Sequence, residues 1–345
     1  MICSETQRGL FHTWELMASA PIERISLIGF GEVGGIFGRD FAQQGIRVSV
    51  YDILFQSSES RAAMLAKALD CGVEARESLD RCLRDAELVI SAVTASRSLE
   101  VARDASKILR RGQIFMDINS VSPATKQADA LQIERSGAHF VESAVMAPVP
   151  PYRLKAPMLL GGSYAAALAP RLAALGMDAT PVSETIGVAS AVKMCRSVMI
   201  KGIEALAVEC LFAARRYGAE EAVLLSLEAT YPQMGWREKL PNYLVSRVAE
   251  HGRRRAEEMR EVAKTLRDVG VDPVMAEATA KRQEWLVLQM IERNLKYKDL
   301  APFSWVTLAE AFSKAASSRK PSRKTPKLSA RPASQPKRRR QNPSR

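Results

Sequence analysis

Histidine and paired cysteine are scarce in this 345-residue sequence. It has three histidines, and its five cysteines, at positions 3, 71, 82, 195 and 210, include no C-x-x-C pair. This spacing argues against a zinc finger or a disulfide framework, and we expect no metal site. Free thiols favour the reducing cytoplasm as the compartment.

Long apolar runs are also missing. No stretch of about 18 apolar residues occurs, so we expect no membrane span. The first residues, MICSETQRGLFHTWELMASAPIERISLIG, lack a basic segment followed by an apolar one, which argues against a secretory signal. We interpret residues 1–20 as an N-terminal arm, whose part up to Met17 is either an addition or an over-extended start.

Acidic residues are absent from the end of the chain. Residues 314–345 carry twelve lysines and arginines, which account for the whole formal net charge of +12 and leave residues 1–313 formally neutral. The segment is rich in Ser and Pro and has almost no large apolar residues, so we expect a disordered basic tail.

This tail has no aromatic residue that could stack on a nucleic-acid base. Nonspecific attraction of its cations to nucleic acid or to another anionic surface stays open. Because the body of the protein is neutral, we favour a solvated tail without a specific partner and do not expect a nucleic-acid-binding protein.

The body of the sequence alternates strands with helices. Short apolar runs separated by helical segments predict strands at 25–30, 47–52, 88–93, 113–118, 139–146 and 156–162. This alternation is typical of an α/β fold with a doubly wound parallel sheet. We therefore expect a Rossmann-type α/β domain at residues 21–184.

From Gly187 onward only helical patterns remain. They predict a long apolar helix at 187–216, an amphipathic helix at about 236–268 and another helix at 273–295. We therefore expect a second, all-helical domain at residues 185–313.

The turn after the first strand reads GFGEVG, with Gly29, Gly31 and Gly34 in G-x-G-x-x-G spacing. It follows a strand and opens a helix, and Asp52 ends the next strand 23 residues after Gly29. That context predicts a dinucleotide site at the helix N-terminus, formed by Gly29, Phe30, Gly31, Glu32, Val33 and Gly34. Asp52 would accept hydrogen bonds from the adenosine ribose, which favours NAD, while Arg61 leaves NADP open.

Three further segments follow this turn in order: DINSVSP at 117–123, FVESAVMAPVP at 140–150 and GVASAVKMCRS at 187–197. With this order the chain resembles the β-hydroxyacid dehydrogenases, relatives of 3-hydroxyisobutyrate dehydrogenase and 6-phosphogluconate dehydrogenase, over about residues 22–295. It is most similar to a subgroup with a 6-phosphogluconate-dehydrogenase-like C-terminal domain. The resemblance implies hydride transfer between a nicotinamide and the hydroxyl-bearing carbon of a β-hydroxy acid. Whether that acid is phosphorylated or dicarboxylic, and whether decarboxylation follows, stay open.

The resemblance also assigns roles to single residues. It implies that Lys193 is the catalytic lysine. It also implies that Val93 and Thr94 lie beside the adenosine, and that Asn119 and Ser120 face the cofactor or the substrate. The substrate-carboxylate loop falls on residues 142–148, where the sequence departs from the family by having Met146, Ala147 and Pro148. A second departure is Arg196, which stands where the family has an asparagine that fixes substrate oxygens.

The chemistry of alcohol oxidation agrees with the role implied for Lys193. The hydroxyl must lose a proton, and a lysine can accept it when its pKa is brought toward neutrality. Burial on an apolar helix and a neighbouring like charge both lower a lysine pKa. Arg196, three residues further on, would provide that charge and grip an anionic substrate. The alternatives are a solvent-facing or structurally paired Lys193 and an ion pair of Arg196 with Glu204.

The segment EHGRRRAEEMREVAK at 250–264 places Arg254 and Arg255 beside several glutamates. A solvated helix face with ion pairs is the default interpretation. The alternative is that Arg254 or Arg255 reaches the cleft between the domains, or that of a partner subunit, and binds a small anionic substrate. Relatives dimerise through long helices of this domain, so the resemblance implies a homodimer.

Two other functions stay open. The altered carboxylate loop is compatible with an imine or aldehyde reductase on the same scaffold. A non-catalytic NAD(P)-binding sensor or scaffold, tethered to an anion by its tail, is the alternative outside the enzymes.

Overall fold

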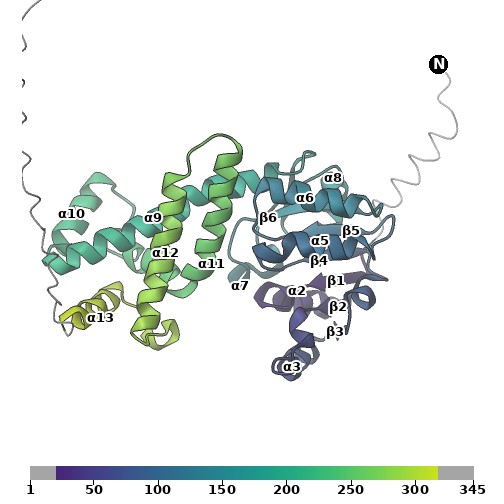
Figure 1. The fold of residues 1–345 in the computed structure, drawn as a ribbon, viewed down its shortest axis with the longest axis horizontal. Coiled ribbons are helices and arrows are strands. Elements are labelled where there is room, and N and C mark those ends of the chain that lie inside the picture. Colours follow the sequence, from purple (N-terminus) through teal and green to yellow (C-terminus); the bar gives the residue numbers. More distant parts are fainter. Residues whose placement is uncertain (1–20, 318–345) are drawn as a thin grey trace, which may run out of the picture.

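The computed structural model describes residues 21–317, with side chains up to Phe312. The predicted arm at 1–20 and the predicted tail beyond residue 317 lie outside the described residues. Figure 1 shows an α/β part next to an elongated helical part, with α9 (Val188–Tyr217) running from one into the other. No helix within residues 21–317 is both long and apolar enough to cross a membrane.

The α/β part is built on one eight-stranded sheet with the order β3-β2-β1-β4-β5-β6-β7-β8. The strands are β1 (Arg24–Ile28), β2 (Arg47–Tyr51), β3 (Glu74–Ala75), β4 (Leu88–Ser91), β5 (Ile114–Asp117), β6 (His139–Val145), β7 (Met158–Gly161) and β8 (Ala179–Ser183). The fold class predicted from the sequence is confirmed, because every neighbouring pair is parallel except β6 and β7.

The sequence patterns did not predict β3, β8 or the antiparallel direction of β7. β3 has only two residues, and β8 is an edge strand whose middle residues are exposed, so neither shows an apolar pattern. β7 runs antiparallel to β6, and the connection between them holds only α7 (Val149–Tyr152) and a short 3₁₀ turn (Arg153–Lys155). It lacks the longer helix that usually carries a parallel crossover.

Helices cover both faces of the sheet and give it two separate cores. These helices are α2 (Glu32–Gln43), α3 (Arg61–Cys71), α4 (Leu79–Leu83), α5 (Ser98–Ser106), α6 (Pro123–Glu134) and α8 (Ala165–Ala174). Alternate residues of one strand enter opposite cores, as Leu88 and Ile90 do on one face and Val89 on the other. Serine followed by proline is a typical helix start, and Ser122 caps α6: its Oγ accepts a hydrogen bond from Thr125 N at 3.3 Å.

The helical part comprises α9, α10 (Glu220–Thr230), α11 (Leu240–Asp268), α12 (Val274–Glu292) and α13 (Trp305–Ser317). α11 and α12 pack against each other and across α9 (Figure 1). The sequence patterns did not predict α10 or α13, and α13 continues past the predicted domain end at 313. The N-cap residue of α10 is Ala219, which has no capping side chain, so α10 carries no start signal of the kind that marks α6.

Glu142, near the end of β6, fixes the start of α9. Its buried carboxylate accepts hydrogen bonds from the backbone N–H groups of Gly187 at 2.6 Å, Ala189 at 3.2 Å and Ser190 at 3.3 Å. It forms no ion pair with any residue in the described part of the chain, so the positive end of the helix stabilises its charge. The contact sets the position of α9, and therefore of Lys193, relative to the sheet.

Gly161 on β7 makes room for this carboxylate. It pairs with Glu142 across the two strands, and a Cβ at Gly161 would lie 2.4 Å from Glu142 Oε1. We predict that Gly161→Ala lowers the free energy of unfolding by about 1–3 kcal/mol, because the carboxylate must move off the helix end. Urea unfolding followed by circular dichroism measures this change.

Gly202→Ala is the matched control for that substitution. A Cβ at Gly202, within α9, would approach nothing closer than Thr279 Oγ1 at 4.0 Å. Alanine also favours the helix, so this variant should gain up to about 1 kcal/mol. Equal stabilities of the two variants would contradict the account of Glu142.

Candidate active site

The glycine turn lies at the carboxyl ends of β1, β2 and β4. Gly29 has φ +94°, and a Cβ there would lie 2.3 Å from Ala92 O, so no other residue fits. A Cβ at Gly34 would lie 2.1 Å from Gly29 O, which shows how closely the start of α2 packs on the turn. Gly31, in contrast, faces open space within 4 Å.

This turn fits a dinucleotide phosphate. Gly31 is the N-terminal cap of α2 and makes no side-chain cap hydrogen bond, so the first N–H groups of the helix are available to a ligand. Glu32 is exposed and Val33 packs partly against the core. The side chain of Phe30 is fully buried, so only its backbone belongs to the turn.

Two charged side chains hold the turn in place. Asp52 accepts hydrogen bonds from Phe30 N at 2.6 Å and from Leu54 N at 2.9 Å, so its carboxylate shapes the turn beside which the ribose is expected. Lys67 Nζ donates to the carbonyls of Phe30 at 2.6 Å and Gly31 at 2.7 Å. No sequence pattern indicated Lys67, which is half-buried and adds positive charge beside the expected phosphates.

Arg61, considered as a contact for a 2′-phosphate, has protein partners near the end of β2. Its guanidinium lies 3.8 Å from Glu77 and donates to Phe55 O at 3.4 Å. Thr94 is exposed next to the turn, with its Oγ1 3.3 Å from Ser96 Oγ.

Asn119 joins the ends of β4 and β5 through its side-chain amide. Its Oδ1 accepts a hydrogen bond from Val93 N at 2.7 Å, and its Nδ2 donates to Ser91 Oγ at 3.0 Å and Ser98 Oγ at 3.1 Å. The side chain is 5% exposed. In the structure this side chain positions the loop that carries Ser120. That Asn119 faces the cofactor or the substrate stays a prediction.

A buried ionic group lies beneath this loop. Lys126 Nζ lies 2.9 Å from Asp117 Oδ2 and also donates to Asp117 O at 2.8 Å. Burial and the neighbouring Asp117 raise the pKa of Asp129 to about 7, and Asp129 accepts a hydrogen bond from Ser98 Oγ at 2.8 Å. Asp117 therefore does more than end β5, because it forms a buried ion pair with Lys126. No sequence pattern indicated that Lys126 is buried.

Lys193 reaches the same loop from the helical side. Its Nζ donates to Ser120 Oγ at 2.6 Å, across 73 residues of sequence. It forms no ion pair with any residue between 21 and 312. The structure therefore brings Ser120 and Lys193 together, and Asn119 and Val93 connect them to the glycine turn.

The pKa of Lys193 is lowered to about 8, above all by burial. Glu258 acts in the opposite direction, and the positive charges of Lys201, Lys126 and Arg254 add to the lowering. Arg196 was expected to supply the like charge. It is exposed instead, with Nη1 3.3 Å from Met146 O in the loop that departs from the family pattern. It is not among the charges that shift the pKa of Lys193 most.

Glu258 on α11 is the main acidic group that acts on Lys193. The charge pattern of residues 250–264 had predicted a solvated helix face for it. Burial alone would raise its pKa, but Lys201, Arg254 and Lys193 bring the pKa down to about 2. Its carboxylate binds Lys201 Nζ at 2.6 Å and Arg254 Nη1 at 2.7 Å. Arg254 thus forms the predicted ion pair on its own helix and remains exposed.

Arg255 does not line the site. Its guanidinium is buried against Glu204, with Nε 2.9 Å from Glu204 Oε2. The ion pair of Arg196 with Glu204 considered from the sequence is therefore wrong, because Arg255 occupies that carboxylate. The pairs Lys201–Glu258 and Arg255–Glu204 join residues 57 and 51 positions apart, and helical spacing alone does not reveal such pairs.

The loop after β6 surrounds the exposed end of this arrangement. Met146 N donates to Pro157 O at 2.8 Å, Ala147 is partly exposed and Pro148 is exposed. These residues offer no side-chain donor to a carboxylate. Among residues 21–312, no three His, Cys, Asp or Glu side chains gather in a way that would hold a metal ion.

Comparison with known families divides the chain into two matched segments. A model described as the NAD binding domain of 6-phosphogluconate dehydrogenase matches residues 24–177. A domain of unknown function, DUF1932, matches residues 214–286.

Individual relatives match over nearly their whole length. An uncharacterized 28.5 kDa protein of Methanothermus fervidus is 30% identical over 259 residues, 74% of this chain and 96% of that protein. A conserved hypothetical protein of Sinorhizobium meliloti 1021 has a structure that is 37% identical, with a TM-score of 0.68 over 86% of this chain and 98% of its own.

A further solved structure is of a conserved protein of unknown function, described as structurally similar to 3-hydroxyacid dehydrogenases. It is 33% identical, with a TM-score of 0.60, and covers 76% of this chain and 96% of its own. The chain therefore belongs to the family of 3-hydroxyacid dehydrogenase-like proteins that join a 6-phosphogluconate-dehydrogenase-type NAD-binding domain to a DUF1932 domain.

Proposed function

We propose that this protein is a nicotinamide-dependent oxidoreductase acting on the hydroxyl group of a β-hydroxy acid, with Lys193 as its general acid and base. The observation that carries the proposal is the hydrogen bond of 2.6 Å between Lys193 Nζ and Ser120 Oγ. It places an amine of lowered pKa at the carboxyl edge of a sheet that also carries the glycine turn.

The cofactor would be held by the backbone of Gly29–Gly34 and the start of α2, with Lys67 adding positive charge. When bound, the nicotinamide supplies a hydride acceptor or donor. The carboxylate of Asp52 beside the turn favours the unphosphorylated ribose of NAD, because a 2′-phosphate would meet a like charge. Thr94 and Ser120 lie on the loops that would line the remaining cofactor.

Lys193 would move the proton of the reaction. In oxidation its neutral amine accepts the proton of the substrate hydroxyl, and in reduction its ammonium returns it. Ser120 holds the amine in place through its hydroxyl. If the product is a β-keto acid, the same ammonium would stabilise the enolate formed by loss of carbon dioxide.

The substrate would be a small anion. Arg196 and Arg254 carry exposed guanidinium groups on α9 and α11, while Met146, Ala147 and Pro148 provide no side-chain donor. Guanidinium groups would therefore replace the missing donors as ligands of a carboxylate or phosphate. A turnover screen with NAD and NADP across β-hydroxy acids, phosphorylated sugar acids and hydroxy dicarboxylates identifies it.

Replacing the amine tests the catalytic role. We predict that Lys193→Ala lowers kcat by about 10²–10⁴-fold, because the reaction loses its proton carrier, while the dissociation constant of NADH changes less than about 2-fold. Steady-state kinetics and fluorescence titration measure the two quantities. Lys281→Ala, which removes an exposed lysine of α12, is the control. A kcat within a factor of two of wild type for Lys193→Ala would overturn the assignment.

The pH dependence tests the electrostatics of the site. Oxidation needs neutral Lys193, so its rate should rise with pH through about 8, and reduction should fall over the same range. Glu258→Gln removes the negative charge that raises this pKa, so the inflection should move by about one unit to lower pH. Glu257→Gln, an exposed neighbour, should leave it unchanged. An inflection that stays in place or rises in Glu258→Gln would contradict the charge assignment.

We also propose a homodimer in the cytoplasm. Val192, Met199 and Leu206 lie seven residues apart on α9 and are 44%, 65% and 56% exposed, an apolar stripe that a second copy would cover. The four cysteines in the described residues are free thiols, which fits a reducing compartment. Light scattering should give twice the chain mass of 38.0 kDa, and Met199→Glu should give the monomer. A monomeric wild-type protein would contradict the dimer.

A further inference from the structure

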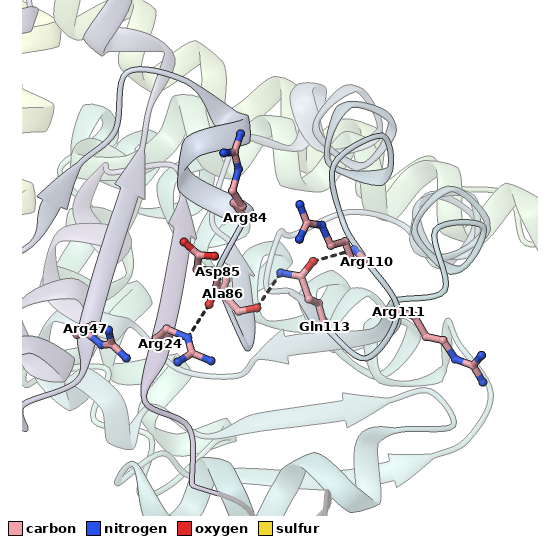
Figure 2. A pocket seen from close by; sticks show the side chains of 8 residues that line it. All are labelled: Arg24, Arg47, Arg84, Asp85, Ala86, Arg110, Arg111 and Gln113. Atoms are coloured by element: carbon pink, nitrogen blue, oxygen red, sulfur yellow. Dashed lines mark hydrogen bonds between the residues drawn. The ribbon is translucent and has the colours of Figure 1, made fainter.

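The opposite edge of the sheet carries a hollow lined by arginines. Its volume is about 450 Å³, and it lies where β1, β2 and β4 begin and where the chain enters β5. The lining residues are Arg24, Arg47, Arg84, Asp85, Ala86, Arg110, Arg111 and Gln113. Figure 2 shows Arg84 and Arg110 on opposite sides of the gap, with Arg24 and Arg47 on the starts of their strands.

This hollow is separate from the candidate active site. Arg24 is the first residue of β1, and Gly29 directly follows the last one. Five residues of strand span roughly 15 Å. A ligand at the amino edge therefore does not reach the glycine turn or Lys193.

Several of the arginines lack a counter-charge. Arg24 is paired with Glu87 at 3.2 Å, and Arg84 is paired with Asp80 on its own helix. Arg47, Arg110 and Arg111 form no ion pair with any residue in the described part of the chain, and Asp85 is the one acidic residue of the lining. Because residues 1–313 are formally neutral, this local excess does not follow from the overall charge.

The floor of the hollow is rigid. The buried amide of Gln113 donates to Leu83 O at 2.8 Å and Ala86 O at 2.7 Å, and its oxygen accepts from Arg110 N at 2.7 Å (Figure 2). These bonds join the turn before β4 to the turn before β5 and fix the backbone from which Arg84, Arg110 and Arg111 extend.

We propose that this hollow binds the phosphate chain of a compact polyanion. Guanidinium groups donate paired hydrogen bonds that match phosphate oxygens. The lining has no aromatic side chain, so a nucleoside base would add no stacking energy. A volume of about 450 Å³ suits a chain of two or three phosphates, whether free or part of a nucleotide.

Calorimetric titration of the full chain with sodium tripolyphosphate tests the proposal, with excess NADH present so that the glycine turn does not compete. We expect saturable binding of one tripolyphosphate per chain. Arg47→Ala/Arg110→Ala should weaken it at least ten-fold, and Arg47→Lys/Arg110→Lys should weaken it several-fold because lysine keeps the charge but loses the paired donors. Circular dichroism confirms that the variants are folded.

The control removes the same charge elsewhere. Arg216→Ala/Arg253→Ala takes away two exposed arginines of the helical part and should leave the dissociation constant unchanged. The proposal is overturned if both alanine pairs weaken binding equally, or if neither weakens it. Tripolyphosphate would then be bound through net charge or by the basic residues beyond 317.

Citrate, a carboxylate of similar charge, should bind at least ten-fold more weakly, and equal affinity would contradict phosphate recognition. ATP should bind as tightly as tripolyphosphate, and a preference of ten-fold or more for ATP would contradict recognition of the phosphate chain alone.

Discussion

The helix α9 carries a buried lysine, Lys201, and a partly buried one, Lys193, and the surroundings of each decide which one remains charged. Lys201 receives the carboxylate of Glu258 at 2.6 Å, a buried ion pair that keeps its ammonium in place. Lys193, two turns earlier, donates to the hydroxyl of Ser120 and has no carboxylate of residues 21–312 within ion-pair distance. Desolvation without a direct counter-ion lowers its pKa to about 8. The same helix therefore holds a structural cation and an amine able to exchange a proton near neutral pH.

Such an amine is useful only if it stays fixed relative to the sheet, and polar contacts between the two parts of the protein provide this. Glu142 holds the start of α9 at the end of β6. Glu261 on α11 accepts a hydrogen bond from Ser122 N at 2.9 Å, next to the loop that carries Ser120. Asn119 fixes that loop to the strand beside the glycine turn. Breaking any of these contacts would leave buried polar groups unpaired, so the arrangement is stiff.

The sequence predicted the parts of this arrangement that depend on local patterns. Strand alternation, the glycine turn and the cap at Ser122 are set by neighbouring residues, and the motif order indicated Lys193. Pairings across the chain left no local trace, which is why the partnership of Arg255 with Glu204 and the burial of Lys126 were missed. Arg196 was placed beside Lys193 from helical spacing, but its long side chain extends to Met146 O instead. Spacing gives the side of a helix and not the direction of a flexible side chain.

The central claim is that Lys193 titrates near neutral pH in the folded protein, and carbon NMR of the protein labelled at lysine Cε tests it most directly. Lys193→Arg identifies the resonance by its loss. The account predicts that this resonance titrates with a midpoint at about pH 8, while those of exposed lysines such as Lys281 titrate at about 10.4. A Lys193 resonance that titrates together with the exposed lysines would contradict the account.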